Sequence, residues 1–389
     1  MEQRLKKLMT LMEEHKLDAL VASLPENVAY GTNYQSLAHW RHPVRRTYAV
    51  IRKDRSPILI MPAGSADAFF RQESQGTDVR TYGDFYVEIG RQPLDQVSSL
   101  FLHALEQRKK GAKPIHLLAE ALTGCRRIGL DEQRVTGGER DELFSLLPGV
   151  ETVDAYGIWR QARAVKSEKE IARIEKATRI TEEALQEALD VLKLGGTEQE
   201  AVIAFRSRVV KEGALPTFIY IGAGFRGAWP NAGGSTHVPR PGEPIRFDLG
   251  CIYEGYHSDI ARTAIKKPVP EEISVKYEAL RVGFEAGLAV IKEGVTPAEV
   301  FERVVQSVRQ HGIPDYQRHH VGHGEGLEGY DPPLLAPGVQ EPLEAGMTLC
   351  LETPHYILGQ GGLHLEDTIV VTKEGYRSLS TMPRHLIEL

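Results

Sequence analysis

PIRFDLGCIYEGYHSDIARTAI, residues 244–265, alternates apolar and polar side chains as the two strands of a β-hairpin do. Residues 253–255, Tyr-Glu-Gly, are a turn signal. If the hairpin is centred between the first two of them, Asp248 lies directly opposite Asp259, with β-carbons about 4.5–5.5 Å apart. Like charges placed opposite each other destabilise a strand pair. The pattern therefore predicts either a bound cation between these acids or exposure of both to water.

A second hairpin is predicted in residues 348–371, TLCLETPHYILGQGGLHLEDTIVV. Its loop falls around residues 358–362, and centring it on residue 359 places Glu352 opposite Glu366. Leu349 and Leu351 then point away from the acids. A bulge in so glycine-rich a loop could shift this register by one residue.

His323 lies in the segment HHVGHGEG, where flanking glycines let the backbone approach a ligand closely. Four carboxylates and one imidazole suit borderline or hard ions such as Mn, Fe, Co or Zn. In two-metal sites the ions lie roughly 3.5–4 Å apart and share a water of lowered pKa. Each residue alone has a simpler interpretation, a solvated or capping carboxylate or a loop histidine. Their conjunction in two hairpins favours a metal site.

The remaining sequence predicts two domains, 1–160 and 161–389. The first alternates helix and strand, with strands near 18–23, 47–53, 57–62 and 127–130 and a helix near 94–109, as in an α/β domain. The second is expected to be α+β, with helices starting at a Ser167–Glu170 capping box and near residues 271 and 297.

Composition excludes several classes of protein. The 389 residues are 41% hydrophobic with a net charge of −6, and we expect neither a membrane span, nor a secretory signal, nor a nucleic-acid-binding surface. Three scattered cysteines argue against a disulfide framework and favour a reducing cytoplasm.

With these motifs in hand, the chain resembles the pita-bread metallohydrolases, which include Xaa-Pro dipeptidase, aminopeptidase P, methionine aminopeptidase and creatinase. The shared words are FDLG, GYHSDIART, GHGEGL, EAGMTLCLE and GGLHLEDTIVVT, and the N-terminal PENVAYGTNY and RRTYAVI resemble the creatinase-type N-terminal domain. The resemblance implies two divalent ions bridged by Asp259 and Glu366. Asp248 would complete the ligands of one ion, and His323 with Glu352 those of the other.

Three positions depart from the family pattern. Asn231 in GAWPN and Tyr330 in YDPP stand where the peptidases usually have histidines, and His364 stands where an arginine is usual. Asn and Tyr can donate hydrogen bonds but cannot carry a proton near pH 7 as imidazole does. His237 or His364 could compensate, although a surface or supporting role is the alternative for each.

The expected reaction is hydrolysis of an amide-type C–N bond, as in an Xaa-Pro dipeptide, by a metal-bridging hydroxide, with Glu352 shuttling the proton. Arg46, and less clearly Arg41 and Trp40, are candidates to bind a substrate carboxylate across a homodimer, with a surface salt bridge as the alternative for Arg46. Two other functions stay open. One is a related hydrolase or lyase acting on a non-peptide amide or amidino compound, and the other is a binding module that has lost the chemistry.

Overall fold

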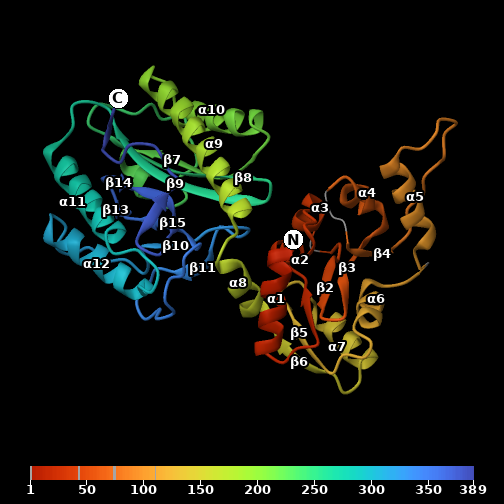
Figure 1. The fold of residues 1–389 in the computed structure, drawn as a ribbon. Helices are drawn as coiled ribbons and strands as arrows, with labels where there is room; N and C mark the ends of the chain where they lie inside the picture. The colour runs from red at the N-terminus through yellow and green to blue at the C-terminus, as the bar shows by residue number, and fades with distance from the viewer. Residues whose placement is uncertain (1, 43, 73–75, 110) are drawn as a thin grey trace. The chain divides into compact units, whose positions relative to one another are not determined.

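The computed structural model describes residues 2–42, 44–72, 76–109 and 111–389 (Figure 1). The chain divides into two compact units, Met1–Ala162 and Arg163–Leu389. Each unit has its own sheet with its own apolar packing, so each is described by itself.

The N-terminal unit is built on a six-stranded mixed sheet in the order β4-β3-β2-β1-β5-β6. β1 pairs with β2 and β2 with β3 in antiparallel fashion, while β3–β4, β1–β5 and β5–β6 are parallel. Parallel neighbours require helical crossovers, which the intervening helices provide. The strands are β1 (Ala19–Ala22), β2 (Tyr48–Arg52), β3 (Arg55–Pro62), β4 (Asp78–Tyr82), β5 (Arg127–Leu130) and β6 (Glu151–Asp154). The helices are α1 (Glu2–Glu14), α2 (Pro25–Thr32), α3 (Leu37–Arg41), α4 (Ala66–Phe70), α5 (Gln96–Gln107), α6 (Pro114–Ala121), α7 (Gly137–Leu146) and α8 (Tyr156–Ala164).

The C-terminal unit contains a nine-stranded sheet whose main path is β11-β10-β12-β15-β9-β8-β7, with β16 on β15 and β17 on β9. A separate two-stranded sheet joins β13 and β14. The strands are β7 (Leu215–Ala223), β8 (Pro244–Tyr253), β9 (Tyr256–Ile265), β10 (Gly322–Gly324), β11 (Asp331–Leu334), β12 (Thr348–Glu352), β13 (His355–Ile357), β14 (Gly361–Leu363), β15 (Glu366–Val371), β16 (Tyr376–Ser378) and β17 (Ile387–Glu388). The helices are α9 (Glu168–Lys193), α10 (Glu198–Lys211), α11 (Glu271–Leu288) and α12 (Pro297–Gln310).

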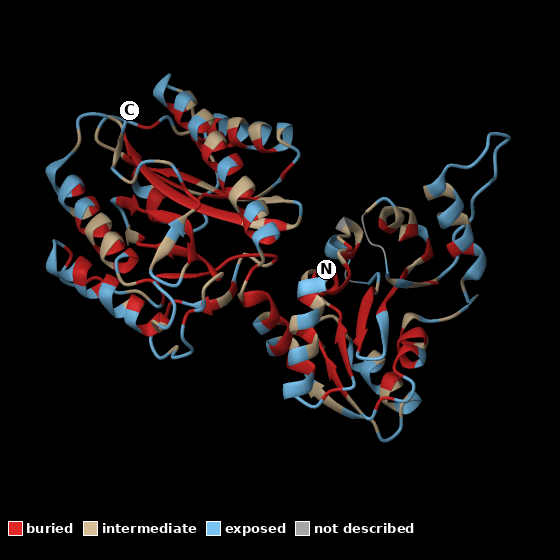
Figure 2. Cartoon of the chain, viewed as in Figure 1, coloured by how far each residue is buried: buried red, intermediate tan, exposed pale blue. Residues whose placement is uncertain are grey.

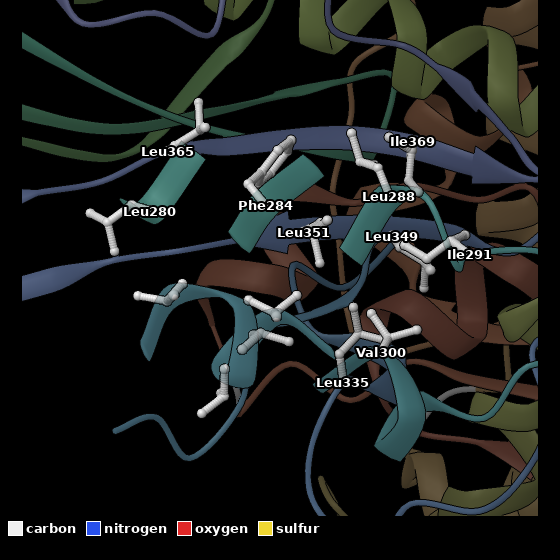
Figure 3. Packing of buried hydrophobic residues seen from close by; sticks show 14 of the residues in the cluster. Leu280, Phe284, Leu288, Ile291, Val300, Leu335, Leu349, Leu351, Leu365 and Ile369 are labelled. Carbon is white, nitrogen blue, oxygen red and sulfur yellow. The ribbon is translucent and has the colours of Figure 1, made fainter. Parts of the chain in front are cut away.

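Helices cover this sheet in two pairs, α9 with α10 and α11 with α12 (Figure 1). The first pair packs its apolar side chains on β7 and β8. The second packs on β12 and β15, where Phe284 and Leu288 of α11 meet Leu349 and Leu351 of β12 (Figure 3). Most residues of the strands are buried, drawn in red in Figure 2, while the outward faces of the helices are exposed. The predicted outward packing of the two leucines, away from the acids, is confirmed.

The first hairpin has a different register from the predicted one. Asp248 pairs with Ala261 and Gly250 with Asp259, because the turn consists of Glu254 and Gly255. Both turn residues have positive φ, 46° and 83°, as a tight two-residue hairpin turn requires. The error is two residues, which preserves the face of every side chain. The two aspartates are therefore diagonal neighbours on one face instead of direct partners.

The second hairpin has the predicted register. Glu352 pairs with Glu366, and the same register continues outward through β13 and β14 to the loop. No one-residue bulge intervenes between these paired strands. Two glutamates thus lie directly opposite each other in the middle of a buried sheet.

Candidate metal centre

Five neighbouring strands of the large sheet each contribute one of the predicted ligands. In the spatial order β10-β12-β15-β9-β8 they are His323, Glu352, Glu366, Asp259 and Asp248. Glu366 also pairs directly with Ala261, which joins the second hairpin to the first. The structure therefore brings all five predicted side chains into one cluster.

The imidazole of His323 faces the acids. Its Nε2 lies 3.6 Å from Asp259 Oδ2 and 3.9 Å from Glu366 Oε1. Its Nδ1 lies 3.1 Å from the carbonyl oxygen of Gly324, which accepts the ring N–H. That hydrogen bond leaves the Nε2 lone pair directed at the acids, the orientation of a histidine prepared to bind a metal.

The acids are short of hydrogen-bond donors. Asp259 Oδ1 and Glu366 Oε1 are buried, and within the described part of the chain neither has a hydrogen-bond partner. Burial, reinforced by neighbouring carboxylates including Asp248, raises the pKa of both groups well above its ordinary value. A divalent cation would relieve both the desolvation and the repulsion. The donor set thus fits a divalent metal ion.

Glu352 has different surroundings. Its Oε1 lies 3.0 Å from His320 Nδ1 and 3.3 Å from Arg318 Nη2, and its Oε2 lies 3.0 Å from His364 Nε2. Burial alone would raise the pKa of Glu352, but hydrogen bonds from the two histidines and the charge of Arg318 hold it well below its ordinary value. Glu352 is therefore a carboxylate in the folded protein.

Arg246 is a site residue that the sequence reasoning missed. It lies two residues before Asp248 on β8, is fully buried, and its Nη1 donates to Asp248 Oδ2 at 2.8 Å. Its other groups donate to the carbonyl oxygens of Gly227, Trp229 and Pro230. The signal was present, since residues i and i+2 of a strand share a face. His320 and Arg318 were also missed, although they lie only three and five residues before His323 in a histidine-rich segment.

Cys350 lies close enough to His323 and Glu366 to share an ion with them, but its thiol is not held as a thiolate. One of its neighbours is Glu325, whose Oε2 accepts from the Cys350 thiol at 3.2 Å. Burial, with the nearby Glu325 charge, raises the pKa of the thiol well above its ordinary value. Since the thiolate is the metal-binding form, Cys350 is held as a hydrogen-bond donor.

The two positions where histidines are usual are at the rim of the cluster. Tyr330 is 55% exposed, and its ring stacks on that of His323 with centroids 3.8 Å apart. Asn231 is exposed, and the carbonyl of Pro230 just before it is held by Arg246. Burial, followed by the charge of Glu352, raises the pKa of Tyr330, so its hydroxyl remains a donor at neutral pH.

The other substrate-binding candidates have partners elsewhere. His237 Nε2 lies 2.7 Å from Glu243 Oε2. In the N-terminal unit, Arg46 Nε lies 2.7 Å from Glu139 Oε1, and Trp40 and Arg41 are exposed at the C-terminal end of α3. In the isolated chain Arg46 therefore forms a salt bridge with Glu139, which was the alternative to substrate binding.

Two family models match most of the chain. Residues 172–373 match metallopeptidase family M24, and residues 4–165 match the Creatinase/Prolidase N-terminal domain. The chain belongs to metallopeptidase family M24. The predicted resemblance and the two-domain α+β architecture are therefore confirmed.

Relatives of this M24 chain include named peptidases. The Xaa-Pro dipeptidase of Pyrococcus horikoshii is 31% identical over 270 residues, which cover 69% of this chain and 77% of that protein. The Xaa-Pro dipeptidase of Lactobacillus delbrueckii subsp. lactis is 26% identical over 387 residues, 98% of each chain. The prolidase structure from Pyrococcus horikoshii OT3 has a TM-score of 0.81 at 26% identity, covering 99% of this chain and 100% of that one. The Xaa-Pro dipeptidase from Bacillus anthracis, with a TM-score of 0.83 at 23% identity over 100% and 99% of the chains, shares the fold.

Membership of family M24 makes this protein a hydrolase of the metallopeptidase type, and the family implies divalent metal cofactors. Among the described helices, none has the length and apolar character that crossing a bilayer requires.

Proposed function

We propose that the protein is a dinuclear-metal-dependent peptidase that cleaves Xaa-Pro dipeptides or related substrates at the amide C–N bond. The observation that carries the proposal is the row of five ligand side chains on five adjacent strands, with buried carboxylate oxygens that have no donor among the described residues. The Xaa-Pro dipeptidase relatives support the substrate class.

Asp248, Asp259, His323, Glu352 and Glu366 would hold the two ions. When bound, such ions polarise the substrate carbonyl and lower the pKa of a water that attacks it. Glu352, which the fold holds as a carboxylate, would be the group that accepts a proton at the site. The exposed residues Tyr330 and Asn231 would donate hydrogen bonds to the substrate carbonyl oxygen as charge develops on it.

A second candidate is hydrolysis or elimination of a non-peptide amide or amidino compound. It is favoured by one observation, that Asn231 and Tyr330 occupy the positions of the two usual histidines. Neither can exchange a proton near neutral pH as the usual histidines can, so the proton transfers of the reaction would differ from those of the family peptidases. His320 and His364 are the imidazoles nearest to Glu352 that could replace that function.

Binding of a substrate carboxylate by Arg46 in a homodimer belongs to the same proposal. Because Arg46 is paired with Glu139, the substrate would have to replace that partner. The Arg46→Ala variant should then raise KM for a substrate with a free carboxylate without changing kcat, and an unchanged KM would remove Arg46 from the site. A cytoplasmic location is proposed from the three free, buried cysteines.

The decisive experiment combines metal analysis with a substrate screen. Wild type, Asp259→Ala and Asp315→Ala, a control at an exposed acid, would be loaded with Mn, Co or Zn and analysed for bound metal. We expect two ions per chain in wild type and control and fewer in Asp259→Ala. Equal metal content in all three, or none in wild type, would overturn the metal centre. Turnover of Ala-Pro or Met-Pro supports the peptidase, and turnover only of N-acyl or amidino compounds supports the second candidate.

A further inference from the structure

His364 occupies a buried position within the metal centre. It lies between β14 and β15, two residues before Glu366, and is 1% exposed. Its Nε2 lies 3.0 Å from Glu352 Oε2 and 3.5 Å from Glu366 Oε2, and its Nδ1 lies 3.7 Å from Asp248 Oδ2. The ring therefore touches carboxylates on three different strands.

The two ring nitrogens of His364 have different surroundings. The Nε2–H donates to Glu352 Oε2, which satisfies that nitrogen. Nδ1 is buried and, among the residues that the structure describes, has no hydrogen-bond partner. In this neutral tautomer the Nδ1 lone pair faces a carboxylate oxygen of Asp248, and two lone pairs in a buried site repel each other. A cation between the two atoms would remove this repulsion.

Arg246 already pairs with Asp248. Its guanidinium, which lies on the same strand β8 two residues before Asp248, supplies a fixed positive charge at 2.8 Å from Asp248 Oδ2. The family usually has an arginine at position 364, and in this chain Arg246 supplies the positive charge from another position. Position 364 is left free for a group with another task.

The distances fit shared coordination. Ligand atoms about 2.0–2.2 Å from one ion lie about 3–3.6 Å apart, depending on geometry. The separation of 3.7 Å between His364 Nδ1 and Asp248 Oδ2 is close to this range. One ligand atom from each of Asp248, His364 and Glu366 can be chosen so that all lie within 4.8 Å of one another.

We propose that His364 is a sixth protein ligand of the metal centre, binding through Nδ1 the same ion as Asp248 while its Nε2–H donates to Glu352. This rests on the proposed function, since it requires a bound ion. A second imidazole makes the site prefer borderline ions such as Co or Zn over Mg, which favours oxygen ligands.

The test is proton NMR of the Co(II)-loaded protein, in which the N–H of each coordinated imidazole gives a strongly shifted, exchangeable signal. Wild type should show two such signals, from His323 and His364, and the His364→Gln and His364→Arg variants should show one. The control is His355→Gln, which removes another histidine of the same hairpin, one whose ring packs against that of Tyr316. This variant should keep both signals. His320→Gln should also keep both.

Titration with Co(II) provides a second measurement. Loss of a direct ligand should weaken binding of one ion by more than about 100-fold, beyond the ~10–100-fold cost of removing a hydrogen-bonding partner. A single signal in wild type, or two signals in either His364 variant with unchanged affinity, would overturn the assignment while leaving the five-ligand centre intact. Absence of any bound Co(II) in wild type would overturn the proposed function itself.

Discussion

Removing Arg246 should destabilise the C-terminal unit more than removal of any exposed ion pair. Arg246→Met keeps a long apolar side chain but deletes four hydrogen bonds, one to Asp248 and three to the carbonyls of Gly227, Trp229 and Pro230. The Arg246 side chain is fully buried, so in the variant these acceptors would be left without hydrogen-bond donors unless water entered the core.

The expected magnitude follows from those contacts. The charged guanidinium is the donor in all four bonds, and one such bond contributes about 1.5–3 kcal/mol, although the four are not additive. Breaking one side of a buried ion pair costs about 3–5 kcal/mol by itself. We therefore expect the free energy of unfolding to fall by about 5 kcal/mol, a large part of the stability of an ordinary domain.

The assay is native-state hydrogen exchange of the metal-free protein, followed at the amides of β8 and β9. These amides report the opening of the sheet in the unit that contains Arg246. The control is Arg281→Met, which removes an exposed pair with Glu278 whose N–O distance is 2.6 Å, and which should cost less than about 1 kcal/mol. A change below about 1 kcal/mol in Arg246→Met, or one equal to the control, would refute the reasoning.

Three further outcomes are expected. Gly322→Ala should cost about 3 kcal/mol in a urea titration, because φ is +144° and a Cβ would lie 2.1 Å from the carbonyl oxygen of Cys350; a cost near zero would contradict the geometry. Cys350→Ser should bind as many ions as wild type in equilibrium dialysis, because the thiol is held protonated, and a lost ion would make it a ligand. Burial, followed by the charge of Arg134, lowers the pKa of His39 from 6.5 to about 4, so the fold holds the neutral ring. The free energy of unfolding should therefore fall by about 3 kcal/mol as the pH falls from 6.5 towards 4, because only the unfolded chain takes up the proton over that range. His39→Gln should reduce this fall, and a pH profile of stability equal to that of wild type would contradict the prediction.

Local sequence patterns were sufficient for the two acidic hairpins. Alternation set which side chains share a face, and the glycine-rich loop centred on residue 359 gave the Glu352–Glu366 register correctly. The first hairpin was placed two residues off because the Tyr-Glu-Gly signal does not say which two residues form the turn. The positive φ of Glu254, unusual for a residue that is not glycine, settles that point only in the folded chain.

The sequence by itself therefore determined the five candidate ligands, the family and the face on which each acid lies, because these depend on spacing and on a period of two. Tertiary structure decided the order of the five strands, since the pairing of β15 with β9 joins residues more than a hundred positions apart. It also decided how charge is distributed around the acids, with Arg246 holding Asp248, and His320, Arg318 and His364 surrounding Glu352. Those contacts cross strands that no local pattern relates, and they distinguish a cluster of acids from a site prepared for metal ions.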